Sequence, residues 1–163
     1  KSIDFPEIAI VRDRRVRYYI EEKVSEDGPD FYTSLDPKVF VLRLVPGMNP
    51  DIFSFLKDHY DGLVIESFGV GGIPCYESFV DAVADWIACG KALVMTTQVP
   101  HEGSDMSVYM VGQVIKKKYR LIEAYDMTTE AIVAKLMWIL AQTKKPAEVR
   151  EMFYRPVQND LNI

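Results

Sequence analysis

Residues 62–99 read GLVIESFGVGGIPCYESFVDAVADWIACGKALVMTTQV, and this stretch decides the fold. An apolar run breaks at a cluster of glycines, a pattern with helical spacing ends at Gly90, and a second apolar run begins at Ala92. Runs that are apolar throughout are typical of strands buried on both faces of a sheet. Glycines between a strand and a helix permit a tight turn and the close approach of another segment. The stretch therefore predicts a strand–helix–strand unit, whose glycine loop must approach something.

The same alternation continues on both sides of this unit. Further patterns predict strands at 39–46 and 121–125 and helices at 50–60, 105–119, 128–144 and 146–156. We expect Asn49 to cap the first of these helices, with Pro50 in its first turn. Thr128 is expected to cap the longest, with Glu130 in its first turn. The alternation predicts an α/β domain over residues 37–163, with a flavodoxin-like, doubly wound sheet of about four parallel strands and helices on both faces.

Residues 1–36 differ from the rest and are expected to form a linker and hairpin segment. The sequence IAIVRDRRVRYYIEEK at 8–23 has two apolar stretches around the polar RDRR, which predicts a hairpin or a pair of short extended pieces. Its arginines suggest a nucleic-acid patch, but the neighbouring Asp13, Glu21 and Glu22 favour a solvated hairpin.

Length and composition predict a soluble protein with one ordinary domain. The chain has 163 residues, of which 48% are hydrophobic and 26% charged. No apolar run is long enough to span a bilayer, and the net charge of −5 argues against nucleic acid as a main ligand. Cys75 and Cys89 lie roughly 21 Å apart along the predicted helix, too far for a disulfide, and free thiols suit a cytoplasmic location. The start at Lys1 without a signal-peptide pattern suggests a trimmed, processed or excised chain.

Ligands of such a sheet meet the loops that follow its strands, here at 45–49, 67–74 and 96–109. The glycine loop lacks the spacing of a dinucleotide fingerprint and no P-loop lysine follows it, so we expect no cofactor. In the third loop His101 lies near Ser104 and Ser107, which suggests serine-hydrolase chemistry. Neither serine lies in a G-x-S-x-G elbow, however, so a simple polar loop is favoured.

Metal binding is not expected either. His59 and His101 lie on different segments, and no second ligand follows either of them at helical or finger spacing. The residues thus predict an α/β domain with a polar, glycine-rich edge but without a self-contained catalytic set. Such an edge is suited to completing a site on another chain.

Three stretches resemble the C-terminal domain of the bacterial L-asparaginases, the cytosolic type I form in particular. They are GLVIESFGVGGIP at 62–74, TTQVPHEGSDMSVYMVGQ at 96–113 and AYDMTTEAIVAKLMWILAQT at 124–143. The opening SIDFPEIAIV at 2–11 resembles the linker between the first and second domains of that family. The resemblance covers essentially the whole chain. It implies an amidohydrolase that converts L-asparagine to L-aspartate and ammonia.

The resemblance also implies that the chemistry lies outside these residues. In this family two threonines, an Asp and a Lys of the N-terminal domain hydrolyse the amide through an acyl-enzyme. We expect that domain to be absent here, so the fragment has no catalytic residue and should be inactive alone. Thr128 and Thr129 fall at the start of the last long helix and are not those nucleophiles. The implied partners are the missing N-terminal domain, the substrate asparagine and a second full-length chain in a homodimer or homotetramer.

In the family, the second domain of one protomer closes over the active site of its partner. The resemblance therefore implies that the glycine loop approaches the neighbouring subunit's substrate site. Tyr109 falls where several type I relatives place a tyrosine that reaches this site in trans. Ser67, Gly71 and Gly72 are further candidates, as backbone lining of the same site.

Type I enzymes can also bind a regulatory asparagine, through an Arg just before the glycine loop and a Cys just after the sequence TQ. Glu66 and Val99 occupy those places here. Without the cation that would pair with the carboxylate of the effector, we expect no regulatory site.

Two functions of other classes remain open. The archaeal glutamine amidotransferase that acts on misacylated tRNA contains an asparaginase-like half with a similar second domain. A free-standing small-molecule-binding module is the third alternative. The sequence DMTTE at 126–130 and the acidic net charge favour the asparaginase.

Overall fold

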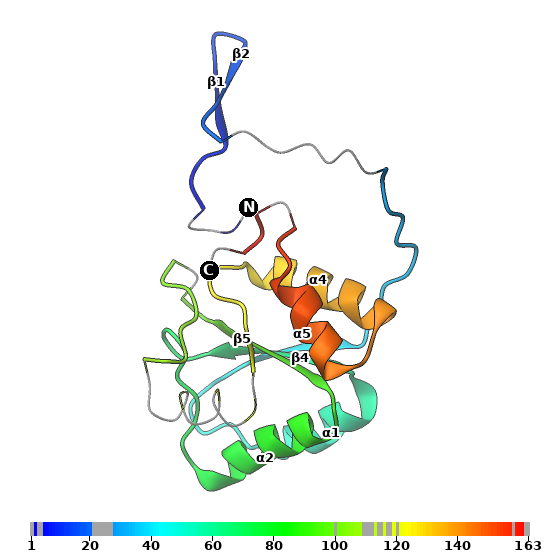
Figure 1. The fold of residues 1–163 in the computed structure, drawn as a ribbon. Coiled ribbons are helices and arrows are strands. Elements are labelled where there is room, and N and C mark those ends of the chain that lie inside the picture. The colour runs from blue at the N-terminus through cyan, green and yellow to red at the C-terminus, as the bar shows by residue number, and fades with distance from the viewer. Residues whose placement is uncertain are drawn as a thin grey trace.

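The computed structural model describes residues 2, 5–20, 28–99, 101–108, 113, 116, 119, 121–157 and 159–161. Its main sheet is parallel and follows the order of the chain (Figure 1), with β3 (Val39–Arg43), β4 (Gly62–Ser67), β5 (Ala92–Thr97) and β6 (Ile122–Glu123). In the register of β4 and β5, Gly62 pairs with Ala92 and Ser67 pairs with Thr97. The two central strands therefore end at the same level, which brings their following loops together.

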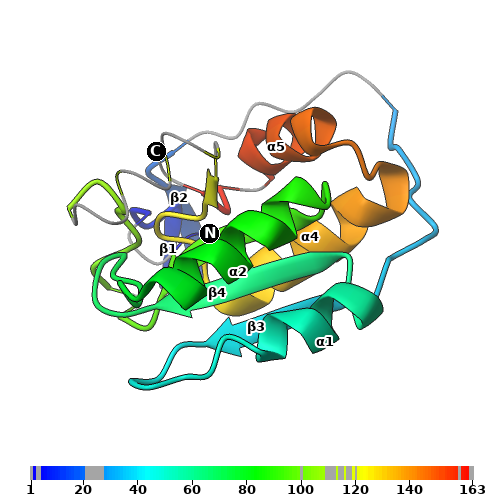
Figure 2. The ribbon, with the colours of Figure 1, turned by 90° about the horizontal axis from the view of Figure 1, so that it is seen from below.

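Helices cover both faces of this sheet, as predicted (Figures 1 and 2). One face carries α1 (Ile52–His59) and α2 (Glu77–Ala88), and the other carries α4 (Thr129–Gln142) and α5 (Pro146–Tyr154). A hydrophobic core lies on each face of the sheet, and successive residues of β4 pack into one core or the other. Leu63 and Ile65 pack with α1 and α2, whereas Val64 packs with α4 and α5. All three side chains are fully buried. Each such burial stabilises the fold by about 1.5–3 kcal/mol.

A glycine begins β4 because α4 lies directly against the strand. A Cβ atom at Gly62 would lie 2.8 Å from Cδ1 of Leu140 and 3.0 Å from Cδ2 of Leu136. A side chain at this position would require these leucine side chains to move. A glycine therefore allows α4 to pack closely against the start of β4.

The helix ends follow their local signals at two of three places. The hydroxyl of Thr128 accepts a hydrogen bond from the amide of Ala131 at 3.3 Å, which confirms the predicted cap of α4. Gly90 has a φ of +72° and its amide donates to Ile87 at the end of α2, as expected. The start of α1 differs from the prediction, because the helix begins at Ile52 with Asp51 in the N-cap position, which leaves Pro50 outside it. The side chain of Asn49 accepts the amide of Asp51 at 3.0 Å in the turn that precedes the helix.

A separate hairpin precedes the sheet and stands apart from it (Figure 1), as the sequence predicts. It consists of β1 (Ala9–Arg12) and β2 (Arg15–Tyr18), which pair antiparallel. Asp13 and Arg14 form its turn with φ angles of 48° and 61°, the geometry that two-residue hairpin turns require.

The predicted helix at 105–119 is only partly described. Residues 105–108 form a turn, whereas residues 113, 116 and 119 are helical, and the remainder of this prediction lies outside the described residues. In the turn, the carboxylate of Asp105 accepts the amide of Ser107 at 2.9 Å and its hydroxyl at 2.5 Å. Within the described part of the chain, no helix is long and apolar enough to cross a membrane.

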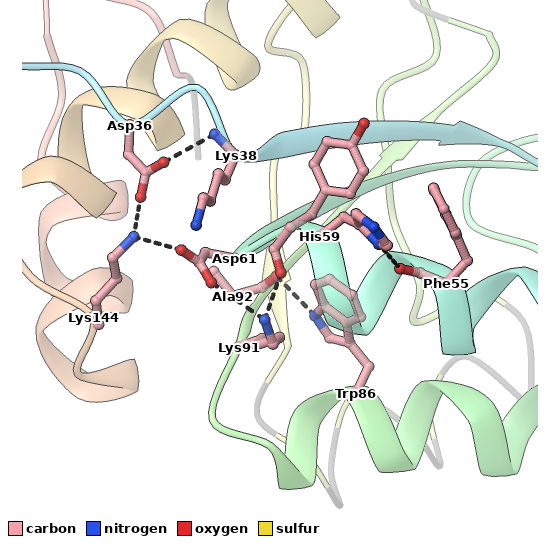
Figure 3. Close-up of polar contacts among 10 residues, drawn as sticks. Asp36, Lys38, Phe55, His59, Asp61, Trp86, Lys91, Ala92 and Lys144 are labelled. Atoms are coloured by element: carbon pink, nitrogen blue, oxygen red, sulfur yellow. Dashed lines mark hydrogen bonds and ion pairs between the residues drawn. The ribbon is translucent and has the colours of Figure 1, made fainter.

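The amino ends of the strands are joined by a chain of ion pairs (Figure 3). Lys144, just after α4, bonds to the carboxylate of Asp36 and lies 3.1 Å from that of Asp61, which begins the turn into β4. Lys91, just before β5, lies 3.2 Å from the same Asp61 carboxylate. We call Asp36, Asp61, Lys91 and Lys144 the amino-end network. It ties the segment before β3 to the starts of β4 and β5.

Candidate functional site at the carboxyl end of the sheet

The carboxyl ends of β4 and β5 carry polar side chains that bind the backbone. The buried hydroxyl of Ser67 donates to the carbonyl of Thr96 at 2.7 Å. Thr97 donates to the carbonyl of Gly69. The amide of Gln98 donates to the carbonyls of Leu44 and Glu66 at 2.7 and 3.0 Å, and thereby links β3 to β4. These side-chain bonds add to the backbone pairing at the strand ends, where the amide of Leu44 also donates to the carbonyl of Glu66, and they tie the ends of β3, β4 and β5 together.

The glycine loop that follows β4 folds back on itself. Phe68 and Gly72 exchange backbone hydrogen bonds at 2.8 and 2.7 Å, which closes a tight turn around Gly71. Gly71 has a φ of +150°, and a Cβ atom there would lie 2.9 Å from Cα of Met106. The amide of Asp105 also donates to the carbonyl of Val70 at 2.5 Å. Within this chain, therefore, the glycine loop approaches the backbone at 105–106.

Segment 101–108 presents exposed polar groups beside this loop. Ser104 is buried, and its hydroxyl donates to Glu123 rather than to His101. The hydroxyl of Ser107 donates to Asp105. Those bonds from Ser107 hold the pKa of Asp105 below its ordinary value, so this carboxylate is ionised at neutral pH. Since both serine hydroxyls are directed at carboxylates, neither is placed for activation by His101.

Glu66 lies on the face of β4 that α4 covers, opposite to the face on which Ser67 lies. It is next to the start of α4. Its carboxylate accepts the hydroxyl of Thr129 at 2.7 Å and lies 3.9 Å from Nη1 of Arg43. The position where a regulatory site would need a cation thus holds an anion that is already hydrogen-bonded. Val99 is 38% exposed. It offers no polar group to a ligand.

The structure brings together three of the four residues proposed from the sequence. Ser67, Gly71 and Gly72 lie on β4 and its loop, where Ser67 and Gly71 are buried and Gly72 is half-buried. Tyr109 lies outside the described residues. Among the described residues, no cluster of His, Cys, Asp and Glu could hold a metal ion.

Two residues that organise this edge were missed by sequence reasoning. Gln98 bridges two strand ends, and Glu123 receives the amide of Met106 at 2.5 Å. An acidic residue inside the apolar run at 121–124 could have revealed Glu123, because a buried charge requires partners. Nothing in the sequence distinguishes Gln98 from an ordinary polar loop residue.

Comparisons with known proteins agree with this architecture. The L-asparaginase of Thermococcus kodakarensis is 35% identical over 161 residues, which cover 99% of this chain and 49% of that protein. Its structure matches with a TM-score of 0.89 over 99% of this chain and 49% of that one. L-asparaginase I of Vibrio cholerae matches at 21% identity with a TM-score of 0.81, over 98% of this chain and 48% of that one, which shows the fold alone.

A second group of relatives carries a different name. One glutamyl-tRNA(Gln) amidotransferase subunit, from Thermofilum pendens, is 36% identical over 121 residues, or 74% of this chain and 26% of that protein. The chain thus spans about half the length of the asparaginase relatives and less of the amidotransferase relative. The family model for the Glutaminase/Asparaginase C-terminal domain matches residues 38–153. The chain therefore belongs to the Glutaminase/Asparaginase C-terminal domain family.

Proposed function

We propose that this chain is the second domain of an L-asparaginase, which hydrolyses L-asparagine to L-aspartate and ammonia. The observation that carries the proposal is the match to the Thermococcus kodakarensis L-asparaginase over 99% of this chain but 49% of that protein. The edge geometry supports it, because the hydroxyls of Ser67, Ser104 and Ser107 all donate to structural acceptors. The nucleophile then comes from residues outside this chain.

The role of this domain is to complete a substrate site on a neighbouring subunit. The glycine loop and segment 101–108 meet at the carboxyl edge, where ligands of open α/β sheets bind. Ser67, Gly71 and Gly72 line the site through their backbone, and Tyr109 reaches it in trans. Residues 1–36 form the linker to the catalytic domain, and residues 37–163 form the domain that closes over the site.

The finer assignment is to the bacterial type I class, acting in the cytoplasm as a homodimer or homotetramer. The support is the family resemblance of the three stretches that include the glycine loop and the start of α4. Sedimentation of the intact protein measures this assembly, and a monomer that retains full activity would contradict it.

Ammonia release by the intact protein tests the activity. We expect hydrolysis of asparagine by the intact protein and none by residues 1–163 alone at equal concentration, because nucleophile, base and oxyanion donors lie elsewhere. Release of ammonia by the isolated chain above a buffer blank would contradict the proposal that the catalytic residues lie outside this chain. Inactivity of the intact protein on asparagine would overturn the proposed enzyme.

A tRNA-dependent amidotransferase is the second candidate. Its support is the set of amidotransferase relatives, which reach 36% identity to this chain. In that case the intact protein, supplied with its partner protein, would use glutamine to amidate glutamyl-tRNA(Gln). Amide transfer to tRNA together with slow hydrolysis of free asparagine would favour this candidate over the first.

A further inference from the structure

A buried carboxylate lies beside the candidate site without belonging to it. Glu123 ends β6 and is 0% exposed, within an otherwise apolar run. Burial of a carboxylate is costly unless its oxygens are hydrogen-bonded and its charge is paired. The partners of Glu123 therefore show what this buried charge holds in place.

Those partners are Ser104 and Met106, in the loop that follows β5, and the helical residue Lys116. Oε1 of Glu123 accepts the backbone amide of Met106 at 2.5 Å and the hydroxyl of Ser104 at 3.3 Å. Oε2 forms an ion pair with Nζ of Lys116. Burial, the largest single influence, would lower the pKa of Lys116, but its hydrogen bond to Glu123 and the attraction of that carboxylate and of other nearby acidic groups together raise that pKa. The lysine is thus charged at neutral pH and compensates the carboxylate.

The same segment is held from its other side by the glycine loop. The amide of Asp105 donates to Val70 at 2.5 Å, and Gly71 packs against Cα of Met106. Ser104 is fixed further by its own amide, which donates to the carbonyl of Tyr125 at 2.8 Å. Residues 104–106 are therefore clamped between β6 and the glycine loop. Because protein interiors are close-packed, a displacement of residues 104–106 should be passed on to the glycine loop.

We propose that Glu123, paired with Lys116, is a positioning residue for the substrate site: it fixes segment 101–108 and, through Gly71, the glycine loop. The kinetic consequence rests on the proposed function, whereas the clamp is a property of this chain alone. Loops that are held loosely bind the ground state and the transition state less well to a similar extent. Loss of the clamp should therefore raise KM more than it lowers kcat.

The test is Glu123→Gln in the intact protein, with Glu151→Gln on the exposed face of α5 as the matched control. Glutamine keeps an acceptor for the Met106 amide but removes the charge that pairs with Lys116. We expect hydrogen exchange of the amides at 104–106 to rise by about tenfold. KM for asparagine should rise by about fivefold with a smaller change in kcat, and the control should change neither quantity.

A second variant keeps the test decisive if Glu123→Gln does not fold. Glu123→Asp keeps the charge but is one methylene shorter, so its carboxylate cannot serve both Met106 and Lys116. We expect the same changes in smaller degree, which a loss of charge alone would not produce. Unchanged exchange at 104–106 with unchanged KM, even alongside a lower Tm, would overturn the inference. If the wild-type protein does not hydrolyse asparagine, the proposed function fails, and exchange in the variants still decides whether the clamp exists.

Discussion

The two ends of one parallel sheet are built in different ways. At the amino end, Lys144 lies between Asp36 and Asp61, so three partly exposed charges join segments far apart in the chain. At the carboxyl end, the buried Ser67 and the half-buried Gln98 donate to backbone carbonyls. The ends of β4 and β5 are thus joined at the first end by partly exposed ion pairs and at the second mainly by neutral hydrogen bonds to backbone carbonyls, beside the buried Glu123 that holds residues 104–106.

The two kinds of bond should respond differently when the groups they join are displaced. Ion pairs between exposed side chains contribute about 0–1 kcal/mol each and tolerate small displacements. Buried hydrogen bonds to backbone groups are lost outright when either group moves, because the carbonyl is then left without a partner. Changes at the amino end should therefore lower stability and spare the site. Equivalent changes at the carboxyl end should affect both.

The largest effect is expected for Gly71→Ala. The new Cβ atom would lie 2.9 Å from the Met106 backbone at a φ of +150°, so strain and a clash act together. We expect a loss of about 2–4 kcal/mol in the free energy of unfolding and a marked fall in kcat/KM. Gly28→Ala is the control, because a Cβ there meets nothing within 4 Å. Urea unfolding of both variants measures the difference. Equal stabilities of the two variants would show that the carboxyl end tolerates a displacement of the glycine loop, contrary to the comparison above.

Tyr109→Phe should affect function without affecting stability. If Tyr109 hydrogen-bonds the substrate in trans as proposed, removal of its hydroxyl alone should lower kcat/KM for asparagine by about tenfold. The melting temperature of the intact enzyme should stay nearly constant. Steady-state kinetics and a thermal melt provide both values. A lower Tm with unchanged kinetics would instead identify Tyr109 as an inward-facing aromatic residue that does not contribute to the substrate site.

Asp61→Asn should lower stability without affecting catalysis. It removes the carboxylate that lies near Lys91 and Lys144, so we expect a loss of about 1 kcal/mol in the free energy of unfolding. KM for asparagine should not change, because the network lies at the far end of the sheet. Asp58→Asn on α1 is the control for charge alone. A change in KM for the Asp61 variant would show that the two ends are coupled.

The stability from Asp61 should also depend on pH. Partial burial, the largest single influence, would raise the pKa of Asp61, but the hydrogen bonds and the positive charges of Lys144 and Lys91 together lower it. A lowered pKa in the folded state stabilises the protein above the unfolded pKa of about 3.9, and this stabilisation is lost as pH falls through the folded value. Unfolding free energies of the wild-type protein and Asp61→Asn should therefore differ at pH 7 and converge as the pH falls through the lowered folded-state pKa of Asp61. A difference that stays constant across the whole acid range would contradict the ion-pair account.

The smallest effect is expected for Glu66→Ala, at the charged position of the carboxyl end that bonds to α4. Loss of its bond to Thr129 should cost about 1 kcal/mol and leave the shape of the asparagine saturation curve unchanged. The physical reason is that the wild-type protein carries at this position an anion, which repels the carboxylate of an effector, and that alanine supplies no cation to pair with it. A sigmoidal curve that Glu66→Ala alters would show a regulatory site.

Local signals in the sequence were sufficient for the helices and strands that the structure describes and for their order. Apolar runs predicted the strands, Thr128 the start of α4 and Gly90 the end of α2. They failed at boundaries that depend on neighbours. The strand predicted at 121–125 is paired in register only at Ile122 and Glu123; the amide of Ala124 still donates to Met95, and the chain then turns at Tyr125, which has a φ of 49°. The predicted start of α1 at Pro50 was wrong, because the helix begins at Ile52.

The sequence by itself determined that strands and helices alternate, since periodicity and capping act within a few residues along the chain. It also marked the glycine loop as a place of close approach. Only the tertiary structure decided that the loop meets residues 105–106 and that Glu123 holds them from the other side. Gly71 and Met106 lie 35 positions apart in the sequence, and Met106 and Glu123 lie 17 apart. No local preference encodes such contacts, because they arise only when parallel strands align and bring their ends to one edge.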